Sequence, residues 1–136
     1  MKSRTIILFL CCAPFITQAQ QRLTIKIEGI EKIQGQLKVG FYTEKEEFAG
    51  ETPLVGKIIK VNSKTAICVL DSIKDGQYAI SIYHDLNSNG KLDKNWFGIP
   101  SEKYGFSNNP KVRKTPTFEQ CRFDFTKKKD LVIKLQ

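Results

Sequence analysis

The sequence is poor in the residues that catalytic and redox sites most often use. It has one histidine and one tryptophan, its four cysteines form no CxxC pair, and no segment is repeated. No stretch carries apolar residues at the helical spacing over several turns, and no apolar run after residue 19 is long enough to span a membrane. These absences argue against thioredoxin-type chemistry, a helical bundle, a repeat array and a membrane-spanning domain.

The N-terminus has the pattern of a secretory signal peptide. Lys2 and Arg4 provide a positive segment, and residues 6–16 form a short apolar run. Thr17-Gln18-Ala19 then ends on a small residue, as signal peptidase requires. We expect cleavage after Ala19, which leaves a single exported domain, residues 20–136, that is periplasmic, extracellular or associated with the cell envelope.

The mature chain is basic. Removing Lys2 and Arg4 from the 22 basic residues leaves 20 against 14 acidic ones, a net charge of +6. This charge favours weak association with anionic envelope surfaces. Nucleic acid is a poor partner, because the basic residues are spread along the predicted strands and do not cluster with stacking aromatic residues. The one basic run, 127–129, is expected to be a solvated turn.

Two cysteines remain after export, and their state is open. Cys11 and Cys12 leave with the signal peptide, and a lipid anchor on either is disfavoured because cleavage there would leave almost no apolar run. Cys68 and Cys121 would be joined in an oxidising compartment by a possible disulfide that closes a loop of about 50 residues. Two buried free thiols are the equal alternative.

Most of the mature chain alternates apolar and polar residues with a period of two, which is the pattern of half-buried strands. Turn signals such as Asn62-Ser63 and Asp75-Gly76 separate these segments. The seven predicted strands are 22–30, 36–43, 57–62, 65–70, 77–84, 121–125 and 131–135.

This arrangement predicts an all-β fold, an antiparallel β-sandwich of about seven strands with one long functional loop. Residues 65–70 form a continuous apolar run, which favours a central strand. Residues 44–49 are expected to form a short turn from which Phe48 packs inward. Residues 85–117 make a long irregular connection, and such connections are usually functional or packed by their own side chains.

That connection opens with the spacing of a calcium loop. Asp85, Asn87, Asn89 and Asp93 stand at its first, third, fifth and ninth positions, Gly90 follows at the sixth, and the backbone carbonyl of Lys91 would serve at the seventh. Alternate side chains of a tightly curled loop can point at one centre, and calcium requires six to eight oxygen ligands. The metal-ligating residues are therefore predicted to be Asp85, Asn87, Asn89, Lys91 and Asp93.

The loop departs from an EF-hand. Trp96 stands where an EF-hand has its bidentate glutamate, and no helices are predicted on either side. Because only two of the ligands carry charge, we expect calcium to bind weakly, with a dissociation constant of about 10⁻⁴–10⁻³ M. The alternative is a metal-free turn rich in Asn and Gly, since Asn and Asp stabilise turns on their own.

Aromatic residues crowd the rest of the connection. Trp96, Tyr104 and Phe106 are candidates for a surface that binds a sugar or an extended peptide, although most aromatic residues in such a loop are expected to anchor it. His84 lies at the end of an inward-facing row and is expected to be structural. A hydrolase that uses His84 with Asp85 or Glu102 is the less favoured alternative, and no catalytic residue is assigned.

The run HDLNSNGKLDKNWFGIPSEKYGFSNN, residues 84–109, resembles the signature of small exported bacterial proteins known as domain of unknown function twenty-one forty-one. The segments GQLKVGFY, GQYAISIYHD and FEQCRFDF extend the resemblance over nearly all of the mature chain. It implies secretion and a sandwich related to immunoglobulin-like or transthyretin-like folds, and it implies no activity.

We therefore expect an exported, non-enzymatic binding or interaction module in which calcium orders an aromatic-rich loop. Its ligand would be a protein, a peptide or a glycan. The alternative is a structural protein that is associated with the cell envelope.

Overall fold

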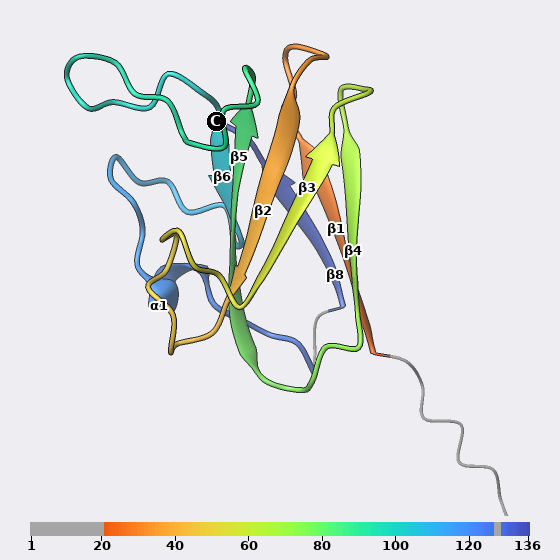
Figure 1. The fold of residues 1–136 in the computed structure, drawn as a ribbon. Coiled ribbons are helices and arrows are strands. Elements are labelled where there is room, and N and C mark those ends of the chain that lie inside the picture. The colour runs from red at the N-terminus through yellow and green to blue at the C-terminus, as the bar shows by residue number, and fades with distance from the viewer. Residues whose placement is uncertain (1–20, 127–128) are drawn as a thin grey trace, which may run out of the picture.

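The computed structural model describes residues 21–126 and 129–136 (Figure 1). The predicted signal peptide, residues 1–19, lies outside the described residues, as do Lys127 and Lys128 of the basic run. The described part contains eight strands and one short helix. They are β1 (Arg22–Glu28), β2 (Gln36–Tyr42), β3 (Val55–Lys60), β4 (Ala66–Asp71), β5 (Gln77–Asp85), β6 (Tyr104–Phe106), α1 (Phe118–Cys121), β7 (Phe123–Asp124) and β8 (Asp130–Lys134).

The strands form two facing sheets, so the predicted all-β sandwich is confirmed (Figure 1). One sheet has three strands in the order β4-β1-β8. The other has five, with the order β3-β2-β5-β6 and with β7 paired to the beginning of β5. The eighth strand, β6, was not predicted because its three residues are too few to show an alternating pattern inside a long connection.

Two features of the three-stranded sheet differ from the prediction. Strands β1 and β8 are parallel, with Ile25 beside Leu131, so the sandwich is not wholly antiparallel. An alternating pattern reveals which face a strand buries but not its direction. The apolar run at β4 forms an edge strand and not a central one, because β4 stands at the end of the order β4-β1-β8. Its Ile67 side chain points outward and is 55% exposed.

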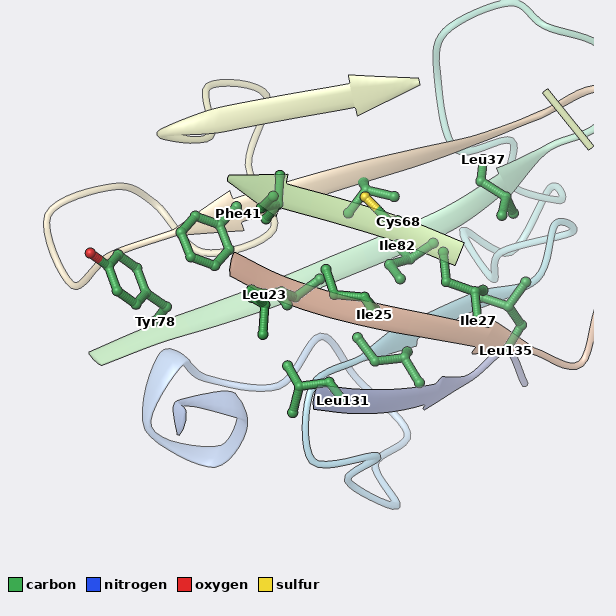
Figure 2. Packing of buried hydrophobic residues seen from close by; sticks show 14 of the residues in the cluster. Leu23, Ile25, Ile27, Leu37, Phe41, Cys68, Tyr78, Ile82, Leu131 and Leu135 are labelled. Carbon is green, nitrogen blue, oxygen red and sulfur yellow. The ribbon is translucent and has the colours of Figure 1, made fainter. Parts of the chain in front are cut away.

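The core lies between the two sheets and is built from the inward rows of their strands (Figure 2). Leu23, Ile25 and Ile27 of β1 are fully buried, as their alternation predicts. Phe41 and Tyr78 stack with ring centroids 4.5 Å apart at one end of this core. Burial of aliphatic and aromatic side chains of this size stabilises the fold by about 1.5–3 kcal/mol each.

A second, smaller cluster covers the outer face of the five-stranded sheet. It contains Ala79, Phe106 and Cys121, and Phe48 of the predicted turn packs against it. Cys68 belongs to the main core instead, together with Tyr78 and its row on β5. Tyr78 and Ala79 are successive residues of β5, so their side chains point to opposite faces of the five-stranded sheet. Cys68 packs on the Tyr78 side and Cys121 on the Ala79 side, so the two cysteines lie on opposite sides of this sheet. Cys68 and Cys121 are free thiols, and the possible disulfide is not formed.

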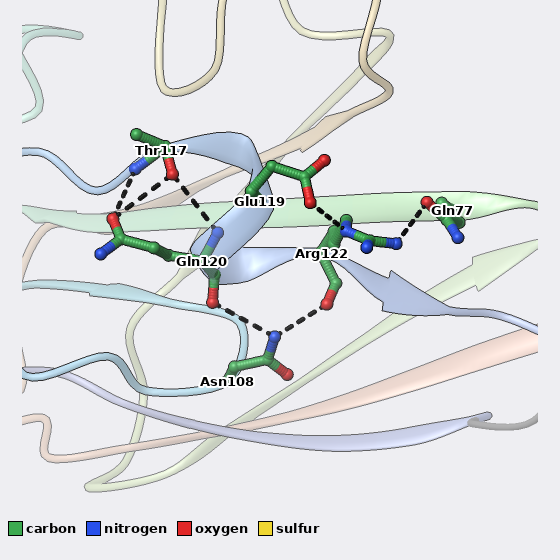
Figure 3. A network of polar contacts seen from close by, with 6 residues as sticks. All are labelled: Gln77, Asn108, Thr117, Glu119, Gln120 and Arg122. Carbon is green, nitrogen blue, oxygen red and sulfur yellow. Dashed lines mark hydrogen bonds and ion pairs between the residues drawn. The ribbon is translucent and has the colours of Figure 1, made fainter.

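The short helix α1 was not predicted, since four residues show no helical period. Thr117 caps its start: the Thr117 hydroxyl accepts the Gln120 N–H, and the Gln120 side chain accepts the Thr117 N–H (Figure 3). Asn108 joins this turn to the segment after β6 by donating to the Arg122 carbonyl at 2.8 Å. Among the described residues, no helix is long and apolar enough to cross a membrane.

One side of the sandwich is closed by the chain end. Gln136, two residues after β8, exchanges two backbone hydrogen bonds with Tyr104 of β6 and so joins the two sheets. Next to this contact, the Asn109 side chain donates to the Val132 carbonyl and accepts the Lys134 N–H, both at 2.8 Å. The Asn109 side chain therefore pairs with backbone groups at the free edge of β8, as a neighbouring strand would.

Candidate functional site

The predicted calcium loop begins where β5 ends, at the top of the sandwich in Figure 1. Its base lies against Gly35, in the connection between β1 and β2. A Cβ atom on Gly35 would stand 2.2 Å from the Asp85 carbonyl oxygen and 2.7 Å from that of Leu86. Gly35 also has a φ of +68°, so glycine is required both by the close approach and by the backbone.

Asp85 is the buried anchor of the loop. Its side chain is fully buried. Its Oδ1 accepts the Asn89 N–H at 3.0 Å, and its Oδ2 accepts the Gly90 N–H at 2.8 Å. The Gln36 side chain of β2 also donates to Oδ2, at 2.9 Å. Burial raises the pKa of Asp85, but the hydrogen bonds from Gln36, Gly90 and Asn89 outweigh it and hold the pKa below its usual value.

Three of the other predicted ligands meet at one point. The Asn87 side chain donates to Asp93 Oδ2 at 2.6 Å, and the Asn89 side chain donates to Asp93 Oδ1 at 2.9 Å. The amide oxygens of Asn87 and Asn89 accept the backbone N–H groups of Asn89 and Lys91, two residues further along. Both asparagines are exposed, so the point of convergence is open to solvent. The Lys91 side chain is exposed, which leaves its backbone carbonyl as the predicted ligand.

Glu102 fastens the two ends of the loop together. It is buried, its Oε1 accepts the Leu86 N–H at 2.8 Å and its Oε2 accepts the Asp93 N–H at 3.0 Å. From the sequence, Glu102 was a candidate only as a catalytic acid in the hydrolase alternative. Its role in the loop was missed, and so was that of Gln36, because neither residue belongs to a local motif.

A positive charge lies beside the loop. The Gly90 carbonyl accepts hydrogen bonds from Lys38 Nζ at 3.1 Å and from Tyr83 Oη at 2.7 Å. Gly90 has a φ of +82°, which is the backbone reversal that glycine was predicted to provide. Burial, together with the nearby charges of Asp85 and Glu102, raises the pKa of Tyr83, so its hydroxyl stays protonated and donates. Lys38 was not recognised from the sequence.

His84 faces the core, where the alternation places it. It is buried, and its Nε2 lies 2.8 Å from the Gln34 carbonyl oxygen. Its backbone N–H donates to the Lys103 carbonyl at 2.8 Å. Asp85 is the next residue on the strand and points to the opposite face. The contacts of His84 are therefore those of a residue that joins β5 to the β1–β2 connection.

The aromatic residues of the connection divide into two groups. Trp96 is 96% exposed and Phe97 is 83% exposed. Phe106 is buried in the second cluster and has a neighbour in Tyr104, with ring centroids 5.6 Å apart. The three residues predicted to bind a ligand therefore do not share one exposed surface, because Trp96 is exposed and the Phe106 ring is enclosed by packing. Tyr104 is half-buried and borders a shallow hollow of about 290 Å³ with Ile99 and Gln136.

Residues 21–126 and 129–136 contain no group of three or more His, Cys, Asp or Glu side chains that could hold a metal ion. The loop offers a different set of donors, which are the carboxylates of Asp85 and Asp93, the amides of Asn87 and Asn89, and backbone carbonyls. Hard oxygen donors of this kind suit calcium better than zinc or copper, which prefer nitrogen and sulfur.

The packed sheets and the loop define an all-β sandwich protein with a candidate cation-binding loop. The family described as "Uncharacterized protein conserved in bacteria (DUF2141)" matches residues 25–133. The chain belongs to this family, which confirms the resemblance seen in residues 84–109. Comparison with curated proteins and with solved structures finds no match.

Proposed function

We propose that this protein is an exported, non-enzymatic binding module whose loop from Asp85 to Asp93 binds calcium. The observation that carries the proposal is the meeting of Asn87 and Asn89 at the carboxylate of Asp93. Side chains at the third, fifth and ninth positions of a turn come together in this way when the turn is built to surround one centre.

The chemistry of the loop suits a cation. The Oδ1 atoms of Asn87 and Asn89 each accept one backbone N–H group. Because an amide oxygen has two lone pairs, each of these oxygens has a second lone pair for a cation. A calcium ion at this point would replace the N–H groups of the two asparagine side chains as the positive partner of the Asp93 carboxylate. Water would complete the six to eight ligands.

Export rests on the signal pattern of residues 1–19. Calcium is abundant outside cells, and extracellular calcium modules bind it with dissociation constants of about 10⁻⁴–10⁻³ M. A loop with two carboxylates beside Lys38 fits this weak range. An exported location and a weak calcium affinity are therefore compatible.

A binding role is favoured over catalysis by the partners of the polar groups. His84 bonds to a backbone carbonyl, and both oxygens of Glu102 accept backbone N–H groups. These contacts hold segments of the chain together, and they do not aim His84 at Asp85 or Glu102 as a hydrolase would require. A structural role in the cell envelope remains the second candidate, and the basic net charge of the chain favours it.

The test is the thermal midpoint of the protein in excess EDTA and across a calcium series to millimolar concentrations. Calcium that binds the folded state alone raises the midpoint. Asp93→Ala removes a predicted ligand without touching the buried anchor, so it should abolish the calcium response while the midpoint in EDTA stays close to that of the parent. Magnesium at equal concentration controls for ionic strength. A midpoint that calcium does not move would show that the loop is a metal-free turn.

A further inference from the structure

The connection between β5 and β6 projects away from the sandwich, and its tip is a built hairpin (Figure 1). The Asn95 side chain accepts the N–H groups of Phe97 and Ile99, each at 3.0 Å. The Asn95 backbone exchanges further hydrogen bonds with Ile99 and Gly98, and Lys94 pairs with Pro100 as an isolated bridge. The tip is thus held by its own backbone and not by burial of its side chains.

This hairpin presents apolar side chains to solvent. Trp96 is 96% exposed, Phe97 is 83% exposed and Ile99 is 57% exposed. Single exposed apolar residues are ordinary, but three within four positions on one turn form a patch, and such patches mark interaction sites. A Cβ atom built on Gly98 would meet nothing within 4 Å, so this side of the turn faces open space.

The exposed charged side chains at the base of the tip are lysines. Lys91 and Lys94 are exposed next to it. The nearby acids keep their negative charge but are less exposed, since Asp93 is half-buried and Glu102 is buried. A calcium ion in the loop would add to this positive charge. The apolar tip with a basic rim therefore complements a surface that is apolar inside and anionic outside.

We propose that the Trp96–Ile99 hairpin inserts into the interface of anionic lipid membranes. Tryptophan and phenylalanine favour the boundary between headgroups and acyl chains, and lysine beside them is attracted to anionic headgroups. A protein partner fits the tip less well, because a stable interface of standard size covers about 800 Å² on each side and the tip offers three protruding side chains. This inference rests on the proposed binding-module function and names its partner, but insertion does not require calcium.

The chain contains a single tryptophan, so intrinsic tryptophan fluorescence reports on the tip alone. We expect a blue shift and co-sedimentation when the protein meets vesicles of equal parts phosphatidylglycerol and phosphatidylcholine. Pure phosphatidylcholine vesicles should bind it weakly, and added salt should release it from the anionic ones.

Variants separate the two components of this binding. Phe97→Ala combined with Ile99→Ala keeps the reporter and should weaken partitioning about tenfold. Lys91→Glu combined with Lys94→Glu should weaken it on anionic vesicles alone. Ile67→Ala on the outer face of β4 removes an equally exposed apolar side chain and should change nothing.

No co-sedimentation and no spectral shift with anionic vesicles would overturn the proposal. A shift that depends on protein concentration without vesicles would also overturn it and would point to a second copy of this chain as the occupant. Measuring vesicle binding in EDTA and in calcium distinguishes the membrane proposal from the calcium-loop proposal. Membrane binding with no calcium effect on the thermal midpoint would refute the calcium loop only, whereas a calcium effect without membrane binding would refute insertion only.

Discussion

The carboxylate of Asp85 closes the turn at Gly90, whose N–H it accepts at 2.8 Å. The two residues lie at the first and sixth positions of the loop, and this bond fixes the reversal that brings the later side chains back over the earlier ones. A fully buried carboxylate with three donors is therefore the support on which the exposed residues of the site depend.

Replacing this anchor should destabilise the protein. In Asp85→Asn, the new side-chain NH₂ group would face at least one N–H group that the Asp85 carboxylate accepts. This substitution should therefore lower the free energy of unfolding by about 2–4 kcal/mol. Asp71→Asn is the matched control, since Asp71 is half-exposed in an ion pair with Arg22 and should matter little. Urea denaturation of both variants at neutral pH measures the difference, and equal stabilities would contradict the role of Asp85.

The same carboxylate should make stability depend on acid. The folded-state pKa of Asp85 is below its usual value, so the ionised form favours folding. This stabilisation is complete above the unfolded-state pKa of about 3.9 and is lost as the pH falls through the lower folded-state pKa. The free energy of unfolding, measured at a series of acidic pH values, should decline more steeply with falling pH for the parent than for Asp85→Asn. Parallel declines would show that Asp85 titrates alike in both states.

Lys38 should oppose the cation that the loop binds. Its ammonium group lies 3.1 Å from the Gly90 carbonyl oxygen. Lys38→Met removes this charge and should tighten calcium binding by roughly three- to tenfold, because like charges at this range repel through a partly aqueous medium. Calorimetric titration with calcium measures the change. Lys26→Met, on the outer face of the other sheet, alters the net charge equally and should leave the affinity as it was.

The Asn109 side chain should protect the edge of β8. Asn109→Gly tolerates the local φ of +48° but loses both hydrogen bonds to the strand, so it should lower the free energy of unfolding by about 1–2 kcal/mol. The Lys134 amide should then exchange faster with deuterated solvent. Asn108→Gly is a matched control, since its amide bonds to Arg122 and not to β8. Unchanged protection of Lys134 would show that the strand edge is satisfied without the amide.

The two cysteines should be inert in the folded protein. Burial raises the pKa of Cys121 to about 12 and raises that of Cys68 as well, so little thiolate is present at neutral pH. Alkylation without reductant, followed by peptide mapping, should modify neither residue in the native state and both after denaturation. Failure to modify them after denaturation would show that they are joined by a disulfide in the isolated protein.

The sequence predicted the parts of this structure that depend on local pattern. The alternation of Leu23, Ile25 and Ile27 identified the inward face of β1, and the calcium-loop spacing identified Asn87, Asn89 and Asp93, which do meet. Such patterns succeed because strand and turn geometry fix where neighbouring side chains point.

The parts that depend on distant residues could not be predicted. Gln36 and Lys38 reach the loop from 49 and 52 residues away, through the register of β2 against β5. Glu102 closes the loop from within an irregular segment, where no period predicts a partner. The parallel pairing of β1 with β8 is also invisible in the pattern, since a strand alternates in the same way in either direction.

The most direct measurement of the central proposal is a nuclear magnetic resonance titration of the protein with calcium. Signals from the side-chain amides of Asn87 and Asn89 and from the backbone amide of Gly90 should shift together and saturate with one dissociation constant. Signals from core residues such as Ile25 should stay in place. Loop signals that do not move at millimolar calcium would contradict the proposal and leave the loop as a turn that is held by its own hydrogen bonds.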